Sequence, residues 1–176
     1  DFQSRNIMVK GEEVFFIDFQ GGMKGGMPYD VASLLWQAKA ELSNEWKERL
    51  LNDYIQEAGK VLGKTIDANL FKKQYYGFVL LRLLQVLGAY GFRGLFERKA
   101  HFLTSIPLGL RNLRSFLEVC TLDKDTPVFA SILNWMVGEE VLNSWYSLNS
   151  MSASTSSRLS QRSTSRPITS SWSVVW

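Results

Sequence analysis

Residues 1–18 read DFQSRNIMVKGEEVFFID, and this stretch decides the fold. It holds two short apolar runs, at residues 6–9 and 14–17, and the second is rich in β-branched and aromatic side chains. Such runs are typical of β-strands. The residues between them read Lys-Gly-Glu-Glu, which is a turn signal. The stretch therefore predicts a small β-hairpin whose second strand ends at Asp18.

The chain after the hairpin is predicted to be mainly helical. A glycine-rich segment at 21–26 and Pro28 come first and are expected to form a mobile loop. Apolar residues then recur at helical spacing. The expected helices start after Asp30 as N-cap, near residue 45, after Asp67, near Phe92, at Ser105–Pro107 and at Thr126–Pro127, with Gly88 and Gly91 as an interruption. The predicted fold class is α+β, mainly α, with a short hairpin followed by about six helices.

The last 30 residues have a different composition from the rest of the chain. Residues 147–176 hold 12 Ser, 3 Thr and 3 Arg and no acidic residue, whereas 1–146 hold 17 basic and 17 acidic residues. A segment with so little apolar periodicity cannot offset its ordering entropy by burial. We therefore expect one domain over 1–146 and a disordered tail over 147–176. The tail is open to interpretation as a linker, a phosphorylatable arm or an out-of-frame remnant of a following domain.

Composition excludes several classes of protein. The chain has one cysteine and one histidine, which argues against a disulfide scaffold, a Cys-based zinc site or a His-rich metal site. No uninterrupted apolar run reaches about 18 residues, so a membrane-spanning helix is not expected. No signal peptide is visible, and the neutral first 146 residues give no support for a nucleic-acid face. The expectation is a cytoplasmic protein with neither nucleic acid nor membrane as a partner.

Three polar residues flank the predicted hairpin in a pattern suited to phosphoryl transfer. Asp1 lies five positions before Asn6, and Asp18 follows the second strand. Phosphoryl transfer needs a carboxylate that accepts a hydroxyl proton and oxygen ligands that hold Mg²⁺ against the nucleotide phosphates. The loop at residues 1–6 can place the base beside one metal ligand. The hairpin that follows can bring a second ligand, at the end of its second strand, back to the same place. The conjunction of these features is far more specific than the Asp/Asn spacing alone.

That conjunction resembles the catalytic half of the protein-kinase-like fold, in its aminoglycoside-phosphotransferase and choline-kinase branch. The family's catalytic loop reads His-x-Asp-x-x-x-x-Asn, and residues 1–6 match it from the Asp onward. Ile17-Asp18-Phe19 is similar to its metal-binding element, and residues 28–35 resemble its Asp-Leu-Ala helix start. Within the family, the sequence is most similar to the bacterial cell-wall sugar kinases that act on N-acetylmuramate or N-acetylglucosamine. The resemblance covers about residues 1–137.

The resemblance implies a role for each matching residue. Asp1 would be the catalytic base, and Asn6 and Asp18 would hold Mg²⁺ and thereby the bound ATP. Asp30 would cap its helix and brace the catalytic loop by accepting backbone N–H bonds. The acceptor would be a small-molecule hydroxyl, with a sugar favoured. Gln3 and Arg5 lie inside the loop, and no role is assigned to them.

The sequence also departs from the family pattern. The family's His has no counterpart, and neither do the Gly-rich loop and the strand Lys that embrace ATP. These belong to an N-terminal lobe that would precede residue 1, so the chain is expected to be a fragment, inactive alone. The alternative is a kinase-derived binding or regulatory module without catalysis, and a weaker one is a Ser/Arg tail that binds nucleic acid or anionic lipid. One set of aromatic residues is expected in the core: Tyr75, Tyr76, Phe78, Tyr90, Phe92 and Phe96.

Overall fold

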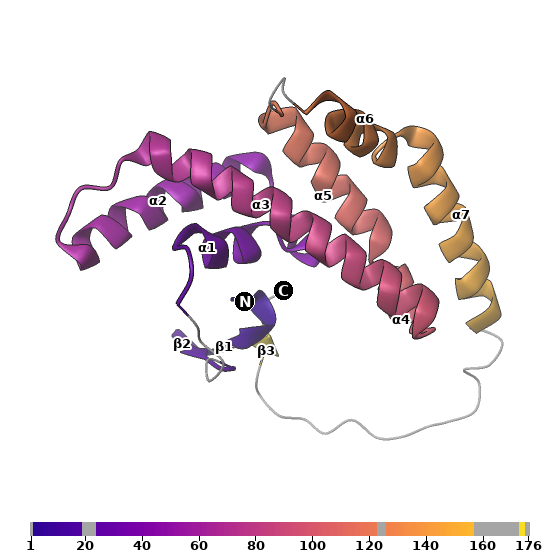
Figure 1. The fold of residues 1–176 in the computed structure, drawn as a ribbon. Helices are drawn as coiled ribbons and strands as arrows, with labels where there is room; N and C mark the ends of the chain where they lie inside the picture. Colours follow the sequence, from indigo (N-terminus) through magenta and orange to yellow (C-terminus); the bar gives the residue numbers. More distant parts are fainter. Residues whose placement is uncertain (1, 19–23, 123–125, 157–172, 175–176) are drawn as a thin grey trace. The chain divides into compact units, whose positions relative to one another are not determined.

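The computed structural model describes residues 2–18, 24–122, 126–156 and 173–174, and these are mainly helical with one small antiparallel sheet (Figure 1). The described residues form seven α-helices, one of them only four residues long, where about six helices were predicted. The chain divides into two compact units. The first runs to Gln85 and includes the strand at 173–174, and the second begins at Val86.

The predicted hairpin is present in the first unit. Strands β1 (Ile7–Lys10) and β2 (Glu13–Phe16) pair antiparallel, with Ile7 opposite Phe16. Gly11 lies in the turn at φ +61°, a backbone conformation that glycine adopts without steric cost. The short strand β3 (Ser173–Val174) pairs with the other edge of β1. The second strand ends at Phe16 rather than at Asp18, because Asp18 has φ +61° and leaves the extended conformation.

The helices of the first unit have recognisable ends. They are α1 (Pro28–Leu35), the 3₁₀ turn η2 (Ala38–Ala40), α2 (Asn44–Leu62) and the start of α3 (Ala68–Gly91). Ser43 caps α2 by accepting the Trp46 N–H, and Gly63 ends that helix at positive φ. Asp67 accepts the N–H groups of Asn69 and Leu70 at the start of α3, as predicted.

The core of the first unit is built around a hydrogen-bonded pair of aromatic residues. Trp36 Nε1 donates to Tyr75 Oη at 2.9 Å, and both side chains are buried. Apolar side chains from α1, α2 and α3 complete this core: Val31, Leu35, Leu51, Ile55, Phe71, Val79 and Leu83. Lys47 Nζ lies 3.8 Å from the centre of a Trp36 ring, which is cation–π geometry, and burial lowers the pKa of Lys47. An ion pair between Lys72 and Glu48 joins α3 to α2.

Helix α3 is longer and more apolar than its neighbours. Residues 68–96, which include α3, pass the test of length and composition for a membrane span, alone among the described helices. A core helix passes the same test. In the first unit, α3 buries Phe71, Tyr75, Val79 and Leu83 along one side, whereas only 22% of the most apolar 18-residue stretch of the segment is buried. The helix also continues through Gly88 without a break, so the predicted interruption there is wrong.

The second unit packs its remaining helices around an aliphatic cluster. After α3 come a π-helical turn η3 (Phe92–Phe96), α4 (Ala100–Leu103), α5 (Ile106–Val119), α6 (Pro127–Met136) and α7 (Glu139–Ser156). Ile106, Leu110 and Leu142 form the buried centre, and six half-buried side chains pack against it: Leu87, Tyr90, Leu103, Met136, Val141 and Trp145. Glycine inside a helix is less favourable than alanine by about 1 kcal/mol. The packing of Leu87 and Tyr90 offsets this free-energy cost at Gly88 and explains why α3 continues.

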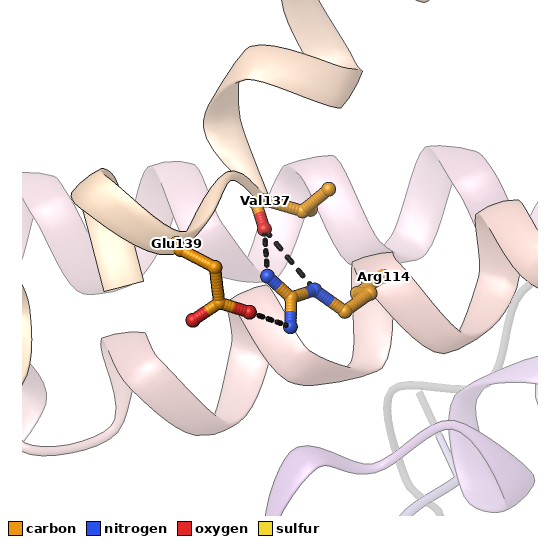
Figure 2. Close-up of polar contacts among 3 residues, drawn as sticks. All are labelled: Arg114, Val137 and Glu139. Carbon is orange, nitrogen blue, oxygen red and sulfur yellow. Dashed lines mark hydrogen bonds and ion pairs between the residues drawn. The ribbon is translucent and has the colours of Figure 1, made fainter. Parts of the chain in front are cut away.

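An arginine on α5 joins that helix to the turn between α6 and α7 (Figure 2). Arg114 Nε and Nη2 donate to the carbonyl oxygen of Val137, the residue that ends α6. Arg114 Nη1 also forms an ion pair with Glu139 at 2.8 Å. The guanidinium therefore satisfies a helix-terminal carbonyl that has no partner within its own helix.

Helix α7 extends past the predicted domain boundary. It runs to Ser156, so residues 147–156 of the predicted tail are helical. Once a helix has been nucleated by its packed half, each added residue costs little, which accounts for the extension. The prediction of a disordered tail also covers residues 157–172 and 175–176, which lie outside the described part of the chain.

Candidate functional site

The predicted catalytic loop is folded tightly after residue 1. Residues 4–6 form a 3₁₀ turn, η1 (Ser4–Asn6), in which the Asn6 N–H donates to the Gln3 carbonyl at 2.9 Å. Ser4 and Asn6 are both buried. Asp1, the predicted base, lies outside the described residues. The loop that would carry it is nevertheless described from Phe2 onward.

Helix α1 holds this loop at two points. Asp30 Oδ1 accepts the Phe2 N–H at 3.3 Å. Just past the other end of the helix, Gln37 Oε1 accepts from the Ser4 N–H at 3.0 Å and from Ser4 Oγ at 2.8 Å. Three hydrogen bonds across about 30 residues of sequence thus fix the backbone directly after the predicted base.

Asp30 makes the bracing contact that was expected of it, but it does not cap the helix. Helix α1 begins at Pro28, with Met27 at the N-cap position, so Asp30 lies inside the first turn. Proline suits the first helical position because its φ is already helical and its missing N–H has no partner to lose. The N-cap prediction is wrong because this proline starts the helix two residues before Asp30. A carboxylate in the first turn still interacts favourably with the helix dipole.

Gln37 is a site residue that sequence reasoning missed. It follows the end of α1 and carries no motif of its own. Its partner Ser4 is 33 positions away, so no local spacing could indicate the contact. Its amide oxygen accepts both of the bonds that Ser4 donates, which makes it the better anchored of the two braces.

The hairpin register brings the two predicted metal ligands to the same end of the sheet. The Ile17 N–H donates to the Asn6 carbonyl at 3.0 Å, which extends the β1–β2 ladder by one residue pair. Asn6 is therefore directly opposite Ile17, the neighbour of Asp18. Asp18 is exposed and has φ +61°. Its carboxylate thus emerges from a sharply turned backbone beside the loop.

The donor set at this end of the hairpin is compatible with magnesium. Mg²⁺ prefers oxygen ligands and usually keeps several waters, with one or two protein carboxylates and substrate phosphates completing its shell. Asp18 offers a carboxylate and Asn6 an amide oxygen. No group of three or more His, Cys, Asp or Glu occurs in the described part of the chain, and Asn6 and Asp18 do not require one.

An apolar pocket lies elsewhere in the first unit, between α3 and the residues that lead into α1. Its volume is about 570 Å³, and it is lined by Gly26, Met27, Pro28, Phe71, Gln74, Gly77, Phe78 and Leu81. A side chain at Gly26 would lie only 2.6 Å from the Phe78 ring, so the chain approaches α3 closely there. Arg82 Nη1 donates to Tyr29 Oη and to Gln85 Oε1 in the same unit. Phe78, which was expected in the core, is half-buried and lines this pocket.

The chain matches no protein-family model, no curated protein and no solved structure. The resemblance to phosphotransferases therefore rests on the residues described above.

Proposed function

We propose that this chain is the C-terminal lobe of an Mg-ATP-dependent phosphotransferase that acts on the hydroxyl of a small molecule, with an amino sugar as the favoured acceptor. One observation carries the proposal. A loop braced to α1 by Asp30 and Gln37 leads into a hairpin that brings Asn6 beside the residue preceding Asp18. Phosphoryl transfer depends mainly on positioning and charge stabilisation, and a rigid loop beside a hairpin supplies both.

The proposed roles follow from this placement. Asp1 accepts the proton of the acceptor hydroxyl, and the hydrogen bonds to Phe2 and Ser4 hold the backbone that carries it. Asn6 and Asp18 hold Mg²⁺. The bound ion would neutralise charge on the nucleotide phosphates. Burial of Asn6 restricts its side chain to few rotamers, which favours a single ligand geometry.

The exposed apolar surface of the hairpin supports the proposal of an additional lobe. All four apolar residues at positions 14–17 are exposed, on both faces of β2 and just beyond it. β2 is also an edge strand among the described strands. An apolar edge strand of this kind is normally covered. We propose that an N-terminal lobe, which would also hold the adenine, covers it.

The test is Mn²⁺ binding to the full chain without nucleotide, measured by electron paramagnetic resonance, because the adenine would be held by the additional lobe. Asp18→Asn keeps the size of the side chain and removes its charge, so we expect Mn²⁺ affinity to fall at least about tenfold. Asp53→Asn is the matched control, because Asp53 is also exposed and its ion pair with Arg49 is long, at 4.0 Å. Equal Mn²⁺ affinity in the wild type, Asp18→Asn and Asp53→Asn would refute the assignment of Asp18 as a metal ligand. Phosphate transfer to a panel of amino sugars, tested with the N-terminal lobe present, then addresses the acceptor.

A non-catalytic binding module is the second candidate, and the apolar pocket favours it. The pocket needs no metal, and its lining is mostly apolar with Gln74 as a polar exception. Tight binding of an apolar ligand with no effect of Asp18→Asn on Mn²⁺ would favour this function over phosphotransfer.

A further inference from the structure

The turn after α3 exposes large apolar side chains that were predicted to be in the core. Phe92, Leu95 and Phe96 are 57%, 60% and 78% exposed. The two phenylalanine rings stack on each other, with centroids 5.5 Å apart and planes 21° apart. The core prediction is therefore wrong for both. Three large apolar side chains within five residues form a cluster, whereas scattered single ones would need no explanation.

The backbone of this turn is nevertheless well anchored. Gly94 is buried, and a side chain there would lie 2.3 Å from Leu103 Cδ2, so the turn packs directly onto that leucine. The Glu97 and Lys99 N–H groups donate to the carbonyls of Phe92 and Arg93. The turn is also π-helical, and π-helical turns are frequently found at functional sites. The exposure of the rings is thus a property of an ordered turn.

Basic side chains lie within the apolar cluster and directly after it. Arg93, Arg98 and Lys99 are exposed, and Glu97 is the only acidic residue between positions 92 and 101, which leaves a net charge of +2. Lys99 Nζ pairs with Glu97 at 2.7 Å. Arg98 has φ +54°, a strained conformation for a non-glycine residue, and such strain is often found at functional positions.

We propose that this surface, which we term the π-turn patch, binds the interface of an anionic lipid bilayer. It consists of Phe92, Arg93, Leu95, Phe96, Arg98 and Lys99. Interfacial binding combines apolar side chains that enter the boundary between headgroups and acyl chains with cations that pair with anionic headgroups. The patch supplies both in one short turn.

A bilayer fits this patch better than a protein partner does. A standard protein interface needs about 800 Å² from each partner. Three side chains on one turn offer much less than that. Insertion into lipid needs no complementary surface on a partner. The affinity depends on the apolar area that enters the bilayer and on the attraction between basic side chains and anionic headgroups. This proposal of a peripheral membrane partner differs from the expectation of no membrane partner that composition gave.

The test is co-flotation of the full chain with vesicles of phosphatidylcholine alone or with about 30% phosphatidylserine. We expect binding to the anionic vesicles and little to the neutral ones. Each cation near an anionic surface contributes about 1 kcal/mol. The double substitution Arg98→Gln with Lys99→Gln should therefore weaken binding about 25-fold, at about 1.4 kcal/mol per tenfold. Leu95→Ser with Phe96→Ser should abolish it.

A matched control is available on α6. Ile132 and Trp135 are 51% and 69% exposed, and α6 carries no charged residue. Ile132→Ser with Trp135→Ser should leave flotation unchanged, and circular dichroism should show wild-type helix content in every variant. Three results would overturn the proposal. They are no binding to either kind of vesicle, equal binding to both kinds, or a loss of binding in the α6 control as large as that in the Leu95→Ser/Phe96→Ser variant. Self-association that is abolished by Leu95→Ser, without vesicle binding, would instead assign the patch to a protein interface.

Discussion

The hydrogen bond between Trp36 and Tyr75 gives the sharpest test of how the first unit is held together. The indole N–H donates to the phenol oxygen at 2.9 Å, an ordinary bond length, and both side chains are buried. Tyr75→Phe removes only the acceptor oxygen and keeps the ring that fills the core. The substitution therefore leaves a buried donor without its partner and creates almost no cavity.

The expected loss of stability follows from that unsatisfied donor. Leaving a buried polar group without a partner costs about 1–3 kcal/mol, more than the net value of the bond itself. At about 1.4 kcal/mol per tenfold, the folding equilibrium should shift at least about fivefold toward the unfolded state. Urea denaturation followed by circular dichroism measures this shift as a lower midpoint at an unchanged slope. Amide hydrogen exchange in α1 and α3 assigns it to the first unit.

The same substitution changes how stability depends on pH. Burial raises the pKa of Tyr75 far above its usual value near 10. Above pH 10 the unfolded chain releases the phenol proton while the folded chain retains it, so the unfolded state is favoured as pH rises. Wild type should therefore lose stability from about pH 10 upward, and Tyr75→Phe should lack that part of the loss. The pKa of Lys47 is lowered by burial, so Lys47 makes stability rise with pH. This contribution is the same in wild type and in Tyr75→Phe, and it therefore cancels when their pH profiles are compared.

A control and a clear refutation complete this test. Tyr146 is 43% exposed, so Tyr146→Phe should change the free energy of unfolding by less than about 0.5 kcal/mol. If Tyr75→Phe had wild-type stability and the same alkaline profile, the bond would contribute nothing and the core assignment would be wrong. A double-mutant cycle with Trp36→Phe should give a coupling of at least about 0.5 kcal/mol.

Two further substitutions test the braces in each unit. Gln37→Met keeps the length of the side chain but removes the acceptor of two Ser4 bonds, so hydrogen exchange at Ser4 should accelerate at least about fivefold; unchanged exchange there would show that the loop does not depend on α1. Arg114→Met leaves the Val137 carbonyl without its donor and breaks the ion pair with Glu139, so the second unit should lose about 1–3 kcal/mol in urea denaturation. Glu139→Gln is the control for Arg114, because it removes only the exposed ion pair, which is expected to contribute less than about 1 kcal/mol.

Sequence reasoning succeeded where the signal is local. The hairpin follows from two apolar runs around a Lys-Gly turn, and Gly11 indeed adopts positive φ. Asp67 was predicted as a cap and accepts two N–H groups at the start of α3. In both places neighbouring residues determine the backbone, so that a stretch of a few residues contains the necessary information.

It failed where tertiary packing decides. Gly88 does not break α3, because Leu87 and Tyr90 pack on the cluster of the second unit. Phe92 and Phe96 are exposed, although aromatic residues at helical spacing usually face a core. The Gln37 brace connects positions 33 apart, and spacing within one element cannot reveal it. Each failure concerns contacts between secondary-structure elements, and such contacts cannot be deduced from composition or periodicity.

The placement of the candidate site depends on a series of contacts within the first unit. Gln37 and Asp30 hold the loop on α1, and Trp36 joins the end of α1 to Tyr75 of α3. Loss of the buried bond should therefore loosen the loop as well as the core, and Tyr75→Phe should weaken Mn²⁺ binding slightly without removing a ligand. The π-turn patch belongs to the second unit. Its variants should leave Mn²⁺ binding unchanged, so the phosphotransferase proposal and the membrane proposal can fail separately.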